Sequence, residues 1–290
     1  MQVAAQLIAS GLAVGALYAL VGLGYVIVYR ATRTLNFSHG QMLMLGAIVG
    51  LQLHVYSGVS YWGSFVLVML GMAALGAIVE VVVYRPLAGG SISSIILATA
   101  AVGSIVQSLV RAKQEQQLSY FPPIVSNEPL DALAIAISPL QLSVVGISVG
   151  IVLAFSLFFR YTRLGRVMRA VSENSDAAAL VGIRVNRVHM LTWAIAGAFA
   201  GIAGLLIAPL TLISPDMGVI ANKGFVAAIV GGFTSLPGTV VGGLIVGVVE
   251  NAVGVYVSTA YKDVFVFLLM LAFLIVRPAG LLGRGSGRRV

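Results

Sequence analysis

The sequence predicts an all-α polytopic membrane protein, and two observations support that prediction: the composition and the long apolar runs. Hydrophobic residues make up 59% of the 290 residues, charged residues make up only 9%, and the mean hydropathy is +1.04. Soluble globular domains carry about 25% charged residues, so this chain lacks the polar side chains that a water-facing surface requires. Disorder is excluded as well, because it needs low hydrophobicity and high charge. A lipid bilayer is therefore the expected solvent.

Apolar runs long enough to cross a bilayer recur along the chain. About 20 residues are needed, since a helix rises about 1.5 Å per residue across about 30 Å of hydrocarbon. The runs do not alternate as the strands of a membrane β-barrel would, so they predict helices. The five clear runs and two shorter ones are Leu7–Tyr29, Tyr61–Tyr84, Leu140–Phe159, His189–Leu210, Lys262–Val276, Gln41–Tyr56 and Ser91–Val110.

One further apolar stretch, Gly218–Val257, is interrupted by Gly231-Gly232 and Pro237-Gly238. Such pairs predict a turn or a broken helix. We interpret the stretch as a hairpin that crosses in and out and turns at residues 235–238. The chain is then a single transmembrane domain, residues 1–290, with about eight to nine spans.

The basic residues predict the orientation. When the spans alternate about the loop 160–188, thirteen of the 17 basic residues share its side of the membrane. The positive-inside rule therefore predicts a cytoplasmic loop and a cytoplasmic tail at 277–290. This placement accounts for the net charge of +8 without a nucleic acid partner. We expect no cleavable signal peptide, because the first apolar run is too long for one.

Residue types that mark enzymes and metal sites are scarce. Cysteine is absent, and His39, His54 and His189 are too scattered for a sequence-local metal site. We expect no catalytic residues, no metal and no directly bound cofactor. The GxxxxGK[ST] phosphate loop does not occur, so this chain cannot bind ATP by that device.

Two other features concern packing and the outer surface. Five glycine pairs at four-residue spacing predict close helix–helix contacts; they are Gly11/Gly15, Gly46/Gly50, Gly146/Gly150, Gly197/Gly201 and Gly243/Gly247. The proline-containing external loop at 111–138 is either a small cap or partner surface, or a plain connector. The sequence leaves both interpretations open.

The central loop is polar, yet it has the features of folded structure. Arg163, Arg166 and Arg169 follow a span at intervals of three residues and suit a helix end near anionic headgroups. Ser175 is a plausible N-cap for a short helix that Gly182 would end. A capped helix with small side chains suits insertion into a groove on another protein. The alternative is an interfacial helix that rests on lipid.

Four motifs carry a family resemblance that covers essentially the whole chain. The central loop, with Glu173, Ala177-Ala178 and Gly182, resembles the "EAA" coupling loop of ABC importer permeases, in the version found in branched-chain amino acid permeases of the H type. The other three motifs are Gly15–Leu20, the segment Leu35–Gly46 with Ser38 in its "NFAHG"-like part, and the C-terminal region from Lys223 to Gly283.

The resemblance implies an ABC importer permease architecture, a place in a bacterial-type cytoplasmic (inner) membrane and a set of partners. These are a second, M-type permease, two cytoplasmic ATPases that bind Mg-ATP, and an external binding protein that delivers the amino acid. The alternatives are a permease of the same family for urea or short amides, or a stand-alone channel or carrier. The residues expected to couple to the ATPases are Arg166, Arg169, Ala170, Glu173, Asn174, Ser175, Asp176, Ala177, Ala178 and Gly182.

Polar groups and breaks inside the spans are the candidate substrate pathway, because polar groups are costly in lipid and half-helix termini can bind both ends of a zwitterion. The candidates are Asn36, Phe37, Ser38, His39, Gly40, Ser235, Pro237, Gly238, Glu250 and Asn251. For Glu250 and Asn251, an interhelical hydrogen-bond clamp and pathway lining remain equally open. Glu80 is interpreted as an interfacial carboxylate near Arg85, and His39 as a hydrogen-bonded structural residue.

Overall fold

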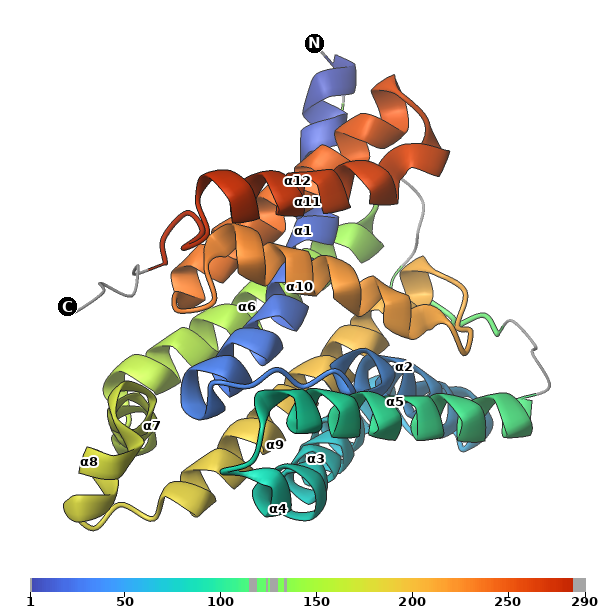
Figure 1. Cartoon of the computed structure of the whole chain (residues 1–290). Helices are drawn as coiled ribbons and strands as arrows, with labels where there is room; N and C mark the ends of the chain where they lie inside the picture. Colours follow the sequence, from blue (N-terminus) through green and yellow to red (C-terminus); the bar gives the residue numbers. More distant parts are fainter. Residues whose placement is uncertain (1, 115–118, 124, 126–129, 133–134, 284–290) are drawn as a thin grey trace. The chain divides into compact units, whose positions relative to one another are not determined.

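The computed structural model describes residues 2–114, 119–123, 125, 130–132 and 135–283 and consists mainly of helices (Figure 1). Within the described residues, seven helical stretches are long and apolar enough to cross a membrane. They are Gln6–Thr32, Tyr61–Leu87, Ile92–Lys113, Pro139–Tyr161, Val185–Leu210, Leu236–Tyr256 and Thr259–Val276. Arg284, Arg288 and Arg289 of the predicted tail, and part of the external loop, lie outside the described residues.

The elements follow one another closely along the chain. In order they are α1 (Gln2–Thr32), α2 (His39–Leu51), η1 (Gln52–Tyr56), α3 (Tyr61–Val79), η2 (Glu80–Tyr84), α4 (Arg85–Leu87), α5 (Ile92–Gln114), β1 (Leu130–Ala132), β2 (Ile135–Ile137), α6 (Pro139–Tyr161), α7 (Arg163–Glu173), α8 (Ser175–Leu180), α9 (Val185–Ile207), η3 (Ala208–Leu210), η4 (Met217–Val219), α10 (Ile220–Gly231), α11 (Leu236–Tyr256), η5 (Thr259–Tyr261) and α12 (Lys262–Val276). The strands β1 and β2 form a small antiparallel hairpin.

The number of long helices is smaller than the eight to nine predicted spans because two stretches are short. The predicted run Gln41–Tyr56 becomes α2 followed by one π-helical turn, η1. The helix α10 has 12 residues and is therefore about 18 Å long. Together with the 3-10 turn η4 directly before it, α10 forms the apolar helical stretch Met217–Gly231, which is still shorter than the hydrocarbon layer of about 30 Å.

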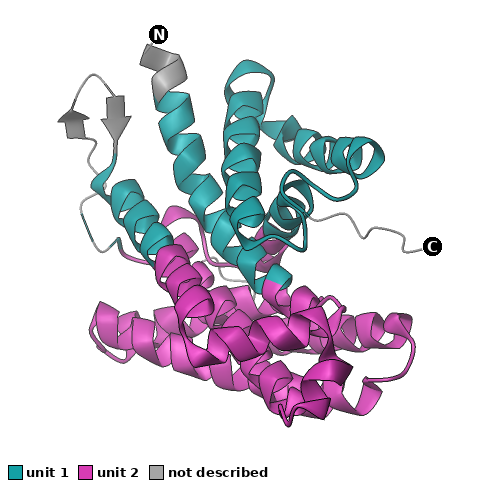
Figure 2. Ribbon diagram, turned by 90° about the vertical axis from the view of Figure 1, so that its left-hand side faces the viewer, with its two compact units in different colours: residues 1–26, 123–150, 222–290 teal, residues 27–122, 151–221 magenta. Residues whose placement is uncertain are grey.

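The chain divides into two compact units, each assembled from separate stretches of sequence (Figure 2). One unit consists of residues 1–26, 123–150 and 222–290, and the other of residues 27–122 and 151–221. The core of the second unit lies where α2 and α3 pack against α9. Two of the predicted glycine pairs lie in these contacts: Gly46 meets the backbone of Gly201, and Gly197 meets that of Met72. The absence of a side chain permits this close approach.

The first unit uses glycine in the same way. Gly11 and Gly15 of α1 lie against the backbone of α11, at Gly247 and Gly243. The predicted pairs on α1 and α11 therefore contact one another. The pair on α6 differs, because a Cβ at Gly146 or Gly150 would meet nothing within 4 Å among the described residues.

This contrast gives a stability prediction. A Cβ at Gly204, on α9, would meet the backbone of Leu43 and Ala47 on α2, whereas one at Gly150 would meet open space. We expect Gly204→Ala to lower the free energy of unfolding by about 1–3 kcal/mol, as overpacking does. Gly150→Ala should be neutral or slightly stabilising, because alanine is the better helix former. Thermal unfolding in detergent micelles measures the stability of both variants. Equal unfolding midpoints for the two variants would contradict the packing described.

The hairpin of the predicted stretch 218–257 forms, but its turn lies earlier than predicted. Ser235 is the N-cap of α11, so Leu236, Pro237 and Gly238 form the first turn of that helix rather than the hairpin turn. The turn itself is residues 232–234, where Gly232 has a φ of +101° that only glycine adopts easily. Backbone N–H groups of Leu281 and Leu282 donate to the carbonyls of residues 230 and 231. The turn therefore lies beside the C-terminal segment.

Candidate functional site

The central loop folds into two short helices, α7 and α8, that follow α6. Thr162 is the N-cap of α7, and its hydroxyl accepts a hydrogen bond from the Gly165 N–H at 3.0 Å. The predicted N-cap of the next helix is wrong by one residue. The side chain of Asn174, not that of Ser175, accepts hydrogen bonds from the N–H groups of Asp176 and Ala177. Gly182 follows α8 with a φ of +86°, which confirms the predicted stop.

The α8 helix presents small and apolar side chains to the surroundings. Ala177 and Ala179 are exposed, and Leu180 and Val181 are 89% and 77% exposed. Ala178 is only 4% exposed and packs inward. An arginine at position 178 would therefore disturb the fold of the segment, whereas a change at Leu180 would alter only its outer face. An exposed apolar patch of this kind is typical of a protein contact.

Two of the predicted coupling arginines make contacts within the chain. Arg169 donates from Nη1 to the carbonyl of Phe159 and from Nη2 to that of Arg160, the latter at 3.2 Å. Arg166 donates to the carbonyl of Tyr161 at 3.2 Å. These carbonyls are the unpaired acceptors at the C-terminal end of α6, where cations are favourable. The two arginines thus fasten α7 to the end of α6.

The remaining coupling candidates lie at the surface of the same segment. Ala170 is half-buried on α7, and Glu173 ends that helix in an exposed position. Met168 and Val171 form the buried side of α7. The α7–α8 segment therefore has one face inside the unit and one face available to a partner.

The first predicted break is observed between α1 and α2. The Asn36 Oδ1 accepts hydrogen bonds from the Ser38 N–H at 3.0 Å and from its hydroxyl at 2.6 Å. The Phe37 N–H donates to Thr99 Oγ1 at 3.2 Å, while the Phe37 ring is 43% exposed. His39 is fully buried at the start of α2. The break is thus held by its own polar side chains.

The start of α2 also allows a close backbone contact. A Cβ at Gly40 would lie 2.5 Å from the carbonyl oxygen of Gly218, in η4. Glycine at position 40 is therefore needed for the approach of these two segments.

The second predicted break is the N-terminal end of α11. The Ser235 hydroxyl accepts a hydrogen bond from the Gly238 N–H at 3.0 Å, and Pro237 occupies the first turn, where no intrahelical N–H is needed. Gly238 lies against the backbone of Gly231. The residues at 36–40 belong to one compact unit, and those at 235–251 belong to the other.

Glu250 is the centre of a polar cluster inside the first unit. Its Oε2 accepts a hydrogen bond from the Tyr18 hydroxyl at 2.7 Å, and its Oε1 pairs with Lys223 Nζ at 2.7 Å. The same Nζ lies 2.8 Å from Asp263 Oδ1. The cluster connects α1, α10, α11 and α12. On the next residue, the Asn251 Nδ2 donates to the carbonyl of Leu7 at 2.8 Å. Both side chains thus make interhelical contacts, as one of the two open alternatives requires.

Tyr18, Lys223 and Asp263 were not predicted as members of this cluster. A sequence signal was available, because Lys223 lies within an apolar stretch and a cation in such a place requires an anionic partner.

Glu80 shows the same principle in the second unit. It is fully buried, and its Oε2 pairs with the Nη2 of Arg85 at 2.7 Å, so the predicted neighbourhood of these two residues is confirmed.

An exposed polar contact fastens the chain after α9. Asp216 pairs with Arg111 of α5 at 2.5 Å, and Gln107 Nε2 donates to the same carboxylate at 3.1 Å. Ser119, which follows α5, and Ile213, which precedes Asp216, form an isolated antiparallel bridge. These contacts position the connection between α9 and η4.

Comparison with known proteins decides the family. The family described as "Branched-chain amino acid transport system / permease component" matches residues 7–274. The chain belongs to this family. The high-affinity branched-chain amino acid transport system permease protein LivH of Salmonella typhimurium is 32% identical to this permease and is matched over 97% of this chain and 96% of its own. BraD of Pseudomonas aeruginosa is 31% identical over 98% and 97% of the two chains.

A solved structure shares the fold of this permease. The chain matches a chain of PsaBC from Streptococcus pneumoniae, solved in complex with Fab, with a TM-score of 0.50 at 14% identity. The match covers 94% of this chain and 91% of the other. The predicted all-α membrane architecture is therefore confirmed.

Proposed function

We propose that this chain is the permease subunit of an ABC importer that carries branched-chain amino acids. The observation that carries the proposal is the full-length match to permeases named for that transport, together with an exposed, capped helix after α6. The chain supplies the membrane passage, and partner subunits supply ATP hydrolysis. A second permease, two ATPases and an external binding protein complete the importer.

In this proposal the α7–α8 segment receives the ATPases. Leu180, Val181 and the exposed alanines enter a groove on the ATPase, in the manner of a helix that lays an apolar face into a partner. ATP-driven closure moves α8, and the contacts between α7 and the end of α6 pass that movement to the span. This requires the segment to be cytoplasmic, as the distribution of basic residues indicates.

The two observed breaks are the proposed solute contacts. Each break places a helix N-terminus beside polar side chains, of which Asn36, Ser38 and His39 are buried and Ser235 is half-buried. A helix terminus of this kind can bind one charged end of an amino acid. Urea or a short amide carries no charged ends and would need only hydrogen bonds. A stand-alone channel or carrier needs no ATPase, so the exposed α8 helix argues against it.

The test is uptake into vesicles that contain the assembled importer. We expect leucine uptake that requires ATP, the ATPases and the external binding protein. Uptake without ATP by this chain alone would overturn the importer proposal. The binding spectrum of the companion binding protein tests the solute: binding of urea or an amide, without leucine, isoleucine or valine, would overturn the substrate and leave the ABC importer intact.

Arg169 gives a prediction about coupling. Because its guanidinium fastens α7 to α6, Arg169→Leu should leave ATPase binding intact and lower ATP-dependent uptake about tenfold, the effect of about 1.4 kcal/mol. Uptake and ATP hydrolysis are measured in the same vesicles. The control is Arg163→Leu, an exposed arginine at the start of the same helix. Normal uptake in Arg169→Leu would show that the α6–α7 junction does not transmit the movement.

A further inference from the structure

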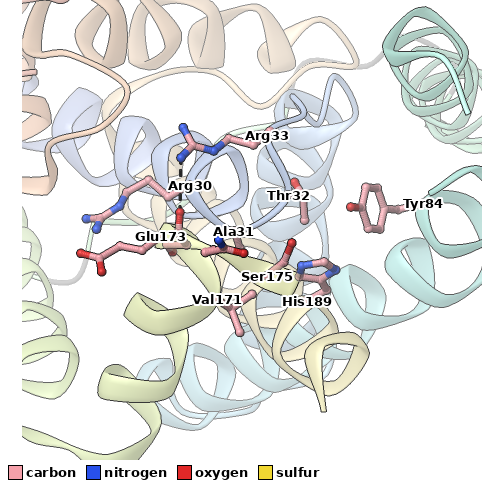
Figure 3. Close-up of a pocket in the computed structure, with 11 residues that line it drawn as sticks. Arg30, Ala31, Thr32, Arg33, Tyr84, Val171, Glu173, Ser175 and His189 are labelled. Carbon is pink, nitrogen blue, oxygen red and sulfur yellow. Dashed lines mark hydrogen bonds between the residues drawn. The ribbon is translucent and has the colours of Figure 1, made fainter. Parts of the chain in front are cut away.

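A cavity of about 320 Å³ lies beside the α7–α8 segment, within one compact unit (Figure 3). Its walls come from the end of α1, the end of η2, the junction of α7 and α8, and the start of α9. The lining residues on which the argument rests are Arg30, Ala31, Arg33, Val171, Glu173 and His189. None of them belongs to the two breaks proposed above as solute contacts.

The rim of the cavity carries charges of both signs. Arg33 and Glu173 are exposed, and Arg30 is half-buried. The Arg33 guanidinium is oriented by a hydrogen bond from its Nη2 to the carbonyl of Ser172 at 3.3 Å. A cationic side chain with further donors, and a carboxylate, therefore border the same small space.

The floor of the cavity is buried and offers a free polar atom. Ala31 and Val171 are buried and apolar. His189 is 9% exposed, and its Nε2 has no hydrogen-bond partner among the described residues. The Tyr84 ring packs edge-on against the His189 ring at 5.7 Å between centroids. A buried polar atom without a partner is costly unless water or a ligand binds it.

The charges at the rim of the cavity and the volume of the cavity indicate which class of ligand it can bind. The carboxylate of Glu173 would repel a phosphate, and 320 Å³ is at the lower end of small-molecule sites. We propose that this cavity binds a zwitterionic amino acid. Its carboxylate lies toward Arg33 and Arg30, its ammonium toward Glu173 and the Nε2 of His189, and its side chain against Ala31 and Val171.

The position of the cavity gives this binding a consequence. This step rests on the proposed function, under which the cavity opens on the cytoplasmic side of the membrane. The imported product accumulates on that side. A bound amino acid would contact both the end of α1 and the α7–α8 junction, which are parts of its wall. Occupancy would therefore restrain α7, and the product would slow its own import.

The experiment loads vesicles that contain the assembled importer with leucine and measures uptake of labelled leucine. Internal leucine should slow both uptake and ATP hydrolysis. N-acetylleucine, which lacks the ammonium, leucinamide, which lacks the carboxylate, and inorganic phosphate should not. In Arg33→Gln and His189→Asn, uptake into empty vesicles should persist, and the inhibitory leucine concentration should rise about tenfold or more, as expected for one lost charged or buried contact. Arg187→Gln, an exposed arginine outside the lining, should behave like the wild type.

Each other outcome is decisive. Equal inhibition of the wild type and both variants would place the product site elsewhere, and inhibition by N-acetylleucine or phosphate would show an anion site instead. Normal uptake that internal leucine does not slow would overturn this inference and leave the proposed function standing. Absence of any ATP-dependent uptake into empty vesicles would overturn both.

Discussion

Replacing Leu180 by aspartate should abolish recovery of the ATPases with the permease and reduce ATP-dependent uptake to background. Leu180 is 89% exposed at the end of α8, so it contributes little to the fold of the chain. Burying a leucine side chain in a partner groove removes its apolar surface from water, which stabilises the complex by about 1.5–3 kcal/mol. A buried carboxylate in that groove would add a desolvation cost. Affinity purification of the tagged permease, with detection of co-purified ATPase, measures the effect.

The matched control for this experiment is Leu212→Asp. Leu212 is also an exposed leucine, at 52%, but it lies in the connection after α9 and outside the α7–α8 segment. This variant should retain the ATPases. If Leu180→Asp also retains them, docking lies elsewhere on the chain, and the alternative from the sequence, a helix that rests on lipid, becomes the better interpretation of α8.

The sequence predicts the fold well because lipid imposes simple rules. Long apolar runs must be helical, and most of their positions agree with the helices observed. Glycine spacing likewise predicts the close contacts of α1 with α11 and of α2 with α9. The errors lie at helix ends. The N-cap at Asn174 and the turn at 232–234 depend on hydrogen bonds between neighbouring residues, and several adjacent residues could have made them.

The candidate site is less predictable because its partners are far apart in sequence. Tyr18 and Glu250 are separated by 232 positions, and no local pattern indicates that they meet. Arg169 presents the same difficulty. Its regular spacing with Arg166 suggests a surface for lipid or a partner, whereas the structure directs both guanidinium groups to carbonyls at the end of α6. Short motifs identify the segment, but they do not show which contacts each residue makes.

Replacing Lys223 by methionine should be the most destabilising single change in the Glu250 cluster. The Lys223 and Glu250 side chains are 16% and 12% exposed, so neither charge is well solvated. Without Lys223, the Glu250 carboxylate keeps only the Tyr18 contact among those described. Breaking a buried pair in this way costs about 3–5 kcal/mol. Glu250→Gln should cost less, because Lys223 would still pair with Asp263, which is 60% exposed.

The double variant Lys223→Met/Glu250→Leu separates the two roles left open for Glu250. If the pair is an interhelical clamp, removing both charges should recover much of the loss seen in Lys223→Met, and uptake should return with stability. Thermal unfolding in detergent and uptake in vesicles measure the two quantities, with Lys262→Met, the neighbouring lysine, as the control. A double variant that is stable but does not transport would instead assign Glu250 to the pathway. A double variant no more stable than Lys223→Met would show that the two charges are not coupled.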